Sequence, residues 1–233
     1  MRCLSLILIV AGLLQTLPVV TFAQQAKPAP AIYEPADVQT KASRVYVFVD
    51  KTGLGHQHGV EAMLGDSTLR LGATNNAGQL VFDMASFRAD TAAARKYVGL
   101  SGTTDESTRA AVDENMKGSA VLDVSRYPTA TFDVTSAEPI GQTSKKGMPL
   151  YQLVGQFTLH GVKRPLNVAV EVEQTQGWLH LRGNFAIKQT DFGITPFSKA
   201  FGAIGVADEL KIYGDLYVAP TEHVSMSEIP ARK

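Results

Sequence analysis

The sequence predicts an all-β protein, either a sandwich or an up-and-down barrel of antiparallel strands, with a short helical insertion. Three observations support this fold class. Many short segments alternate apolar and polar residues, which is the pattern of a strand with one buried face. Residues typical of tight turns separate these segments. A single stretch, residues 89–117, lacks the alternation and is instead rich in Ala, Arg, Asp and Glu.

The two ends of the chain are predicted to lie outside the folded domain. Residues 1–23 have the pattern of a secretory signal peptide, with Arg2, an apolar run and Thr21-Phe22-Ala23 before two glutamines. The apolar run is too short for a confident membrane span. We therefore expect a periplasmic or secreted protein with no stable membrane anchor after cleavage. Residues 24–42 predict a flexible, proline-containing leader, and residues 220–233 predict a polar tail.

The composition excludes several classes of function. The one cysteine, Cys3, lies in the expected signal peptide, so the remainder has no disulfide, thiolate metal site or cysteine nucleophile. The chain has 22 basic and 22 acidic residues, and only Arg2 would be removed with the signal peptide. This balance argues against a nucleic-acid partner and against electrostatic attachment to an anionic membrane. We expect one barrel or sandwich domain over residues 43–219.

The stretch from Leu153 to Glu173 gives the clearest strand signal. Every second residue from 153 to 159 and from 166 to 172 is apolar or glycine. Residues 161–165 lie between the two halves as a turn, because glycine tolerates positive φ and proline stops further pairing. This pattern predicts a long antiparallel hairpin whose apolar face must be covered by a second layer or enclosed in a barrel.

The other strands follow from the same alternation. Val45, Val47 and Val49 share one face of the first strand. A second hairpin is expected between residues 60–64 and 68–71. The predicted strands, including the central hairpin, are residues 44–50, 60–64, 68–71, 80–84, 120–123, 129–137, 153–159, 166–173, 178–187 and 210–218.

The insertion predicts one or two short helices between strands. Asp90 or Thr91 has a side chain that can cap a helix over residues 92–98. Thr103 and Glu106 have the spacing of a capping box for a second helix. One stripe of that helix carries Thr108, Ala111, Val112 and Met116. In a barrel, such an insertion would be a flap or a plug over one end.

Three segments resemble the YceI family of secreted lipocalin-like proteins. FTLHGVKRPL at 157–166, LDVSRYPTATF at 122–132 and FAIKQTDFGI at 185–194 match its motifs in the same order. The resemblance implies an eight-stranded antiparallel lipocalin-like barrel with an interior cavity. It also implies an isoprenoid lipid, including quinone-type molecules, threaded through the barrel as the bound ligand, with no other cofactor. The resemblance transfers no catalytic residue.

The apolar faces of the strands are the first candidate site. A barrel of about eight strands is either filled by its own side chains or holds one small ligand, and alternation alone does not decide between them. Almost no charged residue falls on these faces, which suits a long hydrocarbon. The residues expected to line the cavity are Phe132, Val134, Phe157, Leu159, Val168, Val170, Leu181, Phe185, Phe192, Ile212 and Leu216.

Two loops are further candidates. His56 and His58 share a face of an extended segment, so both imidazoles could reach one metal ion, although a metal site needs three or four ligands. The alternative is a polar loop at the barrel mouth. Residues 191–208 contain three phenylalanines and several glycines. This loop is expected to be either a mobile apolar lip through which a lipid passes or a packed lid over the barrel end.

The motifs expected of common enzymes are missing. The sequence has no HExxH motif, no P-loop and no nucleophile elbow, so we expect no enzyme activity. The predicted function is a secreted or periplasmic protein that holds an apolar isoprenoid-type lipid. The alternatives are a metal-dependent protein using His56 and His58, and a module that binds another envelope protein. A homodimer is compatible with the sequence.

Overall fold

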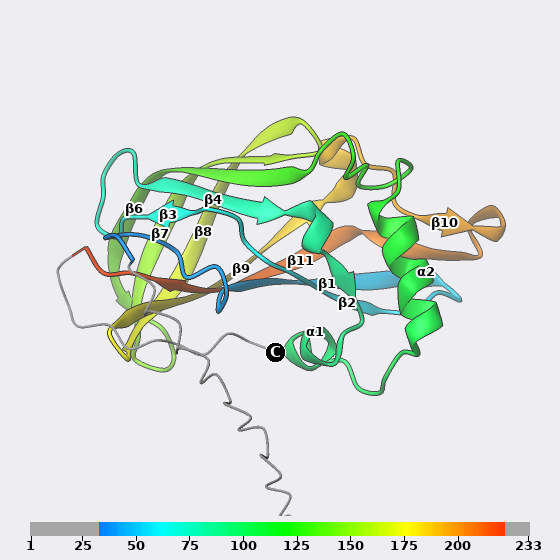
Figure 1. Cartoon of the computed structure of the whole chain (residues 1–233), viewed down its shortest axis with the longest axis horizontal. Coiled ribbons are helices and arrows are strands. Elements are labelled where there is room, and N and C mark those ends of the chain that lie inside the picture. Colours follow the sequence, from blue (N-terminus) through cyan, green and yellow to red (C-terminus); the bar gives the residue numbers. More distant parts are fainter. Residues whose placement is uncertain (1–32, 222–233) are drawn as a thin grey trace, which may run out of the picture. The chain divides into compact units, whose positions relative to one another are not determined.

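The computed structural model shows residues 33–221 as one curled antiparallel sheet with two α-helices, which confirms the predicted all-β fold (Figure 1). The expected signal peptide, residues 24–32 and residues 222–233 lie outside the described residues. The sheet has eleven strands rather than eight, because three strands of two residues each add to the eight longer ones. The strands are β1 (Arg44–Gly53), β2 (His58–Ala62), β3 (Thr68–Leu69), β4 (Gly78–Asp83), β5 (Arg88–Ala89), β6 (Thr129–Thr143), β7 (Pro149–Leu159), β8 (Val162–Thr175), β9 (Trp178–Lys188), β10 (Ser198–Lys199) and β11 (Ile204–Val218).

The two ends of the sheet meet along a short stretch. Hydrogen-bonded neighbours follow the order β3-β4-β6-β7-β8-β9-β11-β1-β2-β5. The residues just after β2 return to β4, where Asp83 N donates to Met63 O at 3.1 Å and Gly65 N donates to Val81 O at 2.9 Å. The apolar faces of the eight longer strands therefore surround a common interior.

The predicted central hairpin is confirmed as β7 and β8, with a tighter turn than expected. Leu159 pairs with Val162, so the turn consists of His160 and Gly161 alone. Their φ angles, 51° and 74°, are both positive, as a two-residue type I′ turn requires. Pro165 therefore lies inside β8. It is tolerated there because this part of β8 pairs with β7 only.

β8 and β9 are paired over only part of their length. The pairing covers Val170–Thr175 of β8, and beyond Gly183 strand β9 pairs with β11 alone. A short 3-10 helix, η2 (Gln189–Phe192), follows β9 and places Phe192 against Phe157 of β7, with ring centroids 5.7 Å apart. Phe157 lies opposite the part of β8 that has no partner on β9. The segment after β9 thus supplies core side chains at the level where β8 and β9 are not paired.

Two predicted strand assignments are wrong. Residues 60–64 and 68–71 do not form a hairpin, because β2 pairs with β1 and β5 whereas β3 pairs with β4. Alternation specifies which face of a strand is buried but not which strand lies beside it. Residues 120–123 form turns after the second helix, and Val121 is buried there.

Residues 33–42 belong to the fold, so the prediction of a leader without structure is wrong for this part. Ala36 and Val38 are buried, and Val38 forms a β-bridge with Val218 at the end of β11. Tyr33 packs edge-on against Trp178, with ring centroids 4.7 Å apart. Trp178 begins β9 and is fully buried. The segment therefore covers the sheet where β9 begins and β11 ends.

The insertion contains two helices, as predicted. The α1 helix (Ala92–Tyr97) is capped by Thr91, whose hydroxyl accepts from Ala94 N at 3.0 Å. The α2 helix (Glu106–Lys117) is capped by Asp105, whose carboxylate accepts from Thr108 N at 2.9 Å. Thr103 is therefore not the cap that its spacing suggested. Aspartate competes well for this position because its carboxylate also interacts favourably with the helix dipole.

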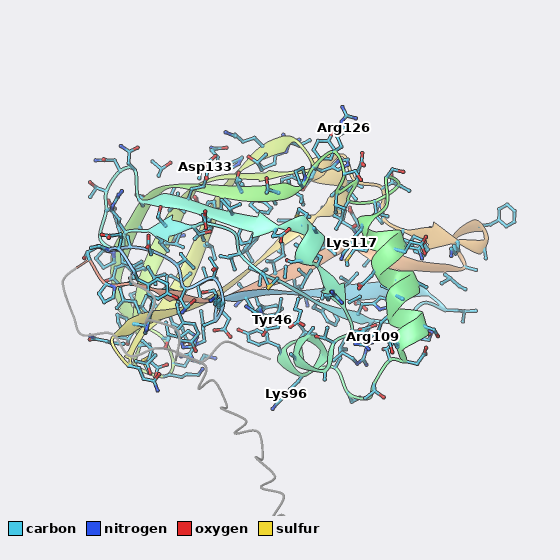
Figure 2. All side chains as sticks on the ribbon, in the orientation of Figure 1. Tyr46, Lys96, Arg109, Lys117, Arg126 and Asp133 are labelled. Atoms are coloured by element: carbon cyan, nitrogen blue, oxygen red, sulfur yellow. The ribbon has the colours of Figure 1, made fainter. Side chains whose placement is uncertain are left out.

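The two helices cover different parts of the sheet. Tyr46 of β1 stacks on Tyr97 of α1, with ring centroids 4.0 Å apart, so α1 packs on the outer face (Figure 2). The α2 helix stands at the end of the sheet near β10 (Figure 1). It is tied there by Lys117, whose Nζ donates to Ala85 O at 2.8 Å (Figure 2). Among residues 33–221, no helix has the length and hydrophobicity needed to span a membrane.

Candidate functional site

The interior of the curled sheet contains a small apolar cavity. Its volume is about 50 Å³ and its walls come from β1, β4, β6, β7, β8, β9 and β11. Eight of the eleven residues predicted to face the interior line it: Phe132, Phe157, Val168, Val170, Leu181, Phe185, Ile212 and Leu216. Their strands alternate as the sequence indicated, so the inward direction of these side chains follows from the pleat. Their contact with a ligand stays a prediction.

The other three predicted residues do not line this cavity. Val134, Leu159 and Phe192 are buried in the surrounding core. Phe192 comes from η2 and packs its ring on Phe157 instead of forming part of a mobile lip. Seven residues that line the cavity were not among the predicted lining residues: Val45, Leu80, Phe82, Leu153, Leu166, Gly183 and Gly214. The alternation of their strands was the signal that would have found them.

Aromatic rings cluster beside the inner cavity. Phe157 lies among the rings of Phe82, Phe185 and Phe192, at centroid distances of 6.1, 5.9 and 5.7 Å, in edge-to-face arrangements. Sites for small molecules usually measure about 300–1,000 Å³, so the volume beside these rings is too small for a long chain. The expectation of a hollow lumen is therefore corrected. In this conformation the lumen is narrowed by its own phenylalanines.

A second apolar cavity lies under α2. Its volume is about 140 Å³. Val112 and Met116, from the apolar stripe of α2, form one wall and β1 forms another. The full lining is Val47, Val49, His58, Val60, Phe87, Val112, Asn115, Met116, Val121, Leu122, Gln189, Phe197, Val206 and Leu210. The sequence had indicated both the stripe and the inward valines of β1, but not that they face each other.

A polar cleft lies beside this second cavity. Its volume is about 510 Å³, and it is bordered by the loop after β1 and by the connection between α1 and α2. His56 and His58, the two predicted metal ligands, both line it. The other lining residues are Lys51, Gly55, Gln57, Asp90, Arg95, Leu100, Ser101, Thr103, Thr104, Asp105 and Thr108.

Asp90 organises the inner wall of the cleft. Its buried carboxylate accepts hydrogen bonds from His58 Nδ1 at 2.7 Å, from Gly59 N at 3.1 Å and from Arg95 Nη1 at 3.0 Å. Burial acts to raise the pKa of Asp90, but these hydrogen bonds outweigh it and hold the pKa below its ordinary value. Asp90 is therefore ionised at neutral pH, and His58 carries its proton on Nδ1. In the neutral imidazole, Nε2 is then left as a hydrogen-bond acceptor.

His58 belongs to both hollows. Its imidazole, 15% exposed, lines the apolar cavity under α2 and the polar cleft. His56 lines the cleft only. In the part of the chain from 33 to 221, no group of three or more His, Cys, Asp or Glu side chains is placed to hold a metal ion. His180 lies on β9, where it pairs with Asp215 of β11. Metal binding by His56 and His58 stays a prediction.

The aromatic loop at residues 191–208 divides into three parts. Phe192 is buried in the core, as a packed lid would require. Phe197 is half-buried and lines the cavity under α2. Phe201 is fully exposed at the connection between β10 and β11. The loop therefore contributes both to the packed core and to an exposed apolar tip.

The fold and its hollows define a curled antiparallel sheet with an apolar interior that ends at a polar cleft. Residues 37–217 match the family model of the YceI-like domain, and the chain belongs to this family. The predicted domain, residues 43–219, omitted the first residues of the matched region. These residues were missed because their proline-rich surroundings resemble a linker.

The matching proteins are distant in sequence. A UPF0312 protein of Azotobacter vinelandii is 30% identical over 118 residues, which cover 47% of this chain and 58% of that protein. The chain thus spans less than two thirds of this relative's length. The crystal structure of Burkholderia cenocepacia BcnA has 20% identity and a TM-score of 0.51, covering 78% of this chain and 99% of that one. A polyisoprenoid binding domain from Saccharophagus degradans has 15% identity and a TM-score of 0.54, covering 80% and 100%. Both structures share the fold.

Proposed function

We propose that this protein binds an amphiphilic lipid of the isoprenoid type and performs no catalytic step. One observation carries the proposal: His58 borders both the apolar cavity under α2 and the polar cleft. A hydrocarbon chain in the cavity would therefore have its polar end at the cleft. The membership in the YceI-like family supports this function, and so does the shared fold with a polyisoprenoid binding domain of another organism.

The hydrocarbon chain of the lipid would extend from the cavity under α2 into the inner cavity. The valines of β1 connect the two apolar cavities, because Val45 lines the inner cavity and Val47 lines the cavity under α2. Further insertion requires Phe157 to leave its ring contacts, at about 0.5–1.5 kcal/mol for each of the three pairs. Burying one five-carbon unit stabilises by about 4 kcal/mol, at about 0.8 kcal/mol per carbon group. The first unit past Phe157 roughly offsets the rearrangement, and each further unit adds affinity.

The polar end would be recognised by the side chains of the cleft. In its neutral form, His58 offers Nε2 as a hydrogen-bond acceptor, and Lys51 offers donors, whereas the guanidinium of Arg95 already donates to Asp90, Ser101 O and Gly102 O. Asp90 and Asp105 balance these two positive charges. A neutral head group that both donates and accepts hydrogen bonds therefore fits the cleft better than a strongly anionic one.

The amino-terminal pattern supports a place of action outside the cytoplasm. Arg2, the apolar run and Ala23 have the spacing of a signal peptide. We propose that the mature protein is periplasmic or secreted and meets its lipid there. Mass spectrometry of the exported protein tests this, with a mature chain beginning at Gln24 as the expected result.

Solvent extraction of the purified protein, followed by mass spectrometry, tests the binding function. We expect an apolar molecule with a repeated five-carbon unit. Val112→Asp places a charge in the wall of the cavity under α2 and should abolish its retention. Ala111→Asp puts the same charge on the exposed side of the same helix and is the matched control. Circular dichroism verifies that both variants fold. An empty extract from the wild-type protein, or equal retention by both variants, would contradict the proposal.

A further inference from the structure

Three large apolar side chains are exposed together at one end of the sheet. Leu54 is 79% exposed, Ile204 is 43% exposed and Phe201 is fully exposed. Leu54 follows β1, Phe201 lies in the short 3-10 helix η3 (Ala200–Gly202) between β10 and β11, and Ile204 begins β11. The two segments are adjacent, because Gly53 pairs with Ile204 and Leu54 N donates to Ala203 O at 2.9 Å. We call Leu54, Phe201 and Ile204 the apolar tip.

The backbone holds the apolar tip in its exposed position. Ala200 and Phe201 both have left-handed φ angles, 53° and 55°, which side chains other than glycine rarely adopt. The pairing of β10 with β11 fixes this turn. The two segments also approach very closely, since a Cβ on Gly53 would lie only 2.4 Å from Ala203 O. A side chain held outward by a constrained turn is expected to have a partner outside the chain.

The apolar tip adjoins the candidate lipid site. Phe197 and Val206, from the same β10–β11 region, line the cavity under α2. Lys51 and Gly55, from the same segment as Leu54, line the polar cleft. Figure 1 shows β10 projecting beyond the sheet at the end where α2 stands. A partner surface that bound the apolar tip would therefore lie next to the cavity under α2 and the polar cleft.

We propose that the apolar tip inserts into the surface of a lipid bilayer, which brings the mouth of the site against the membrane that supplies or receives its lipid. This inference rests on the proposed lipid-binding function. The tip presents protruding single side chains, which suits the deformable acyl region of a bilayer. Lys51 and Lys199 are both exposed beside the tip and would meet the phosphates of anionic lipids. Asp50 and Asp208 are the nearest acidic neighbours in sequence, and both carboxylates already accept hydrogen bonds, Asp50 from Gln57 Nε2 at 2.9 Å and Asp208 from Thr190 N at 2.9 Å.

Co-sedimentation with vesicles tests this docking. The full chain is mixed with vesicles of phosphatidylcholine, either alone or with phosphatidylglycerol. The double variant Leu54→Ser/Phe201→Ser should lower the partition constant at least tenfold. The matched control is Ile140→Ser/Val154→Ser, which removes two exposed apolar side chains from β6 and β7 and should leave the partition unchanged. All variants keep the same amino terminus, so residues 1–23 contribute equally to each.

Fluorescence shows whether the tip itself enters the bilayer. The Phe201→Trp variant should shift its emission to shorter wavelength with vesicles and be quenched by brominated acyl chains. The native Trp178 is 1% exposed and should not respond. Equal partition of the tip and control variants would overturn the proposal, as would an unquenched Phe201→Trp variant. Specific capture of the tip by a protein, with no binding to vesicles, would overturn it as well.

The same tip variants distinguish docking to a bilayer from binding of lipid in the cavities. Leu54→Ser/Phe201→Ser changes no residue that lines the inner cavity, the cavity under α2 or the polar cleft, so extracted lipid should be retained at the wild-type level. Transfer of a prenyl lipid from donor vesicles should become at least tenfold slower. Retention with slow transfer supports docking. Empty extracts from the wild-type protein would refute the lipid-binding function, whereas normal retention with normal transfer would refute only the docking.

Discussion

Replacing Phe157 with alanine should destabilise the fold by about 4 kcal/mol. Truncation of a buried phenylalanine to alanine usually costs about 3–5 kcal/mol. Phe157 is 5% exposed and its ring meets three others. It also borders an existing cavity of about 50 Å³, which shows that the neighbouring side chains do not rearrange to fill free space here. The loss is therefore expected in the middle of that range or above it.

Urea denaturation followed by circular dichroism measures this loss. With a slope of about 2.5 kcal/mol per molar urea, the midpoint should fall by about 1.5 M. Phe157→Leu is the control, because leucine keeps most of the buried area and loses only the ring contacts. Its cost should be about 1–2 kcal/mol. A shift below about 0.4 M for Phe157→Ala would refute the conclusion that this ring fills the lumen.

The same variant should have an opposite effect on lipid binding. If Phe157 must move to admit a chain, alanine at this position removes that cost, about 0.5–1.5 kcal/mol for each of three ring pairs. Phe157→Ala should therefore bind a short prenyl alcohol at least tenfold more tightly than the wild-type protein does. Isothermal titration calorimetry measures the two dissociation constants. Weaker binding by the variant would contradict the proposed path of the chain through the inner cavity.

Three other predictions concern packing, pH and metal. Gly155→Ala should lower the free energy of unfolding by about 3 kcal/mol or more in a urea titration, because the new Cβ would lie 2.0 Å from a backbone carbonyl oxygen. Gly214→Ala is the control and should be tolerated, because its Cβ would lie 3.9 Å from the nearest atom. The pKa of Asp90 is lowered in the fold, so its charged form stabilises the folded state at pH values above the ordinary carboxyl pKa. The difference in unfolding free energy between the wild-type protein and Asp90→Asn should therefore be full at pH 6 and shrink below about pH 4. A difference that stays constant with pH would contradict this. Zinc titration should give no stoichiometric binding, because no third ligand is placed beside His56 and His58 among residues 33–221; binding that is lost in His56→Ala/His58→Ala would refute it.

Local patterns predicted much of the secondary structure and the facing of its side chains. The period of two identified the inward residues of β7 and β8, and a type I′ turn at His160-Gly161 joins them. The helical insertion was also predicted from short-range spacing, and Thr91, one of the two residues proposed as its first cap, is the cap observed. These features depend on residues a few positions apart, so a single sequence contains the information.

Strand partners could not be predicted, because alternation is the same whichever strand lies alongside. The sequence suggested that residues 60–64 and 68–71 form a hairpin, whereas β2 pairs with β1 and β5. Residues 33–42 resemble a linker, and no local pattern indicates that Val38 forms a bridge with the distant Val218. Such contacts depend on the closure of the whole sheet.

The amino-acid sequence was sufficient to predict an all-β chain with apolar inward faces, a helical insertion and motifs of the YceI family. The free volume of the interior and the position of the polar end of the site became known only from the folded structure. Four phenylalanines from β4, β7, β9 and η2 converge in the lumen. His58 and Asp90 are 32 residues apart and meet beside the cavity under α2. Free volume and such pairings depend on how side chains from distant segments pack together, and the pattern within any one segment does not contain that information.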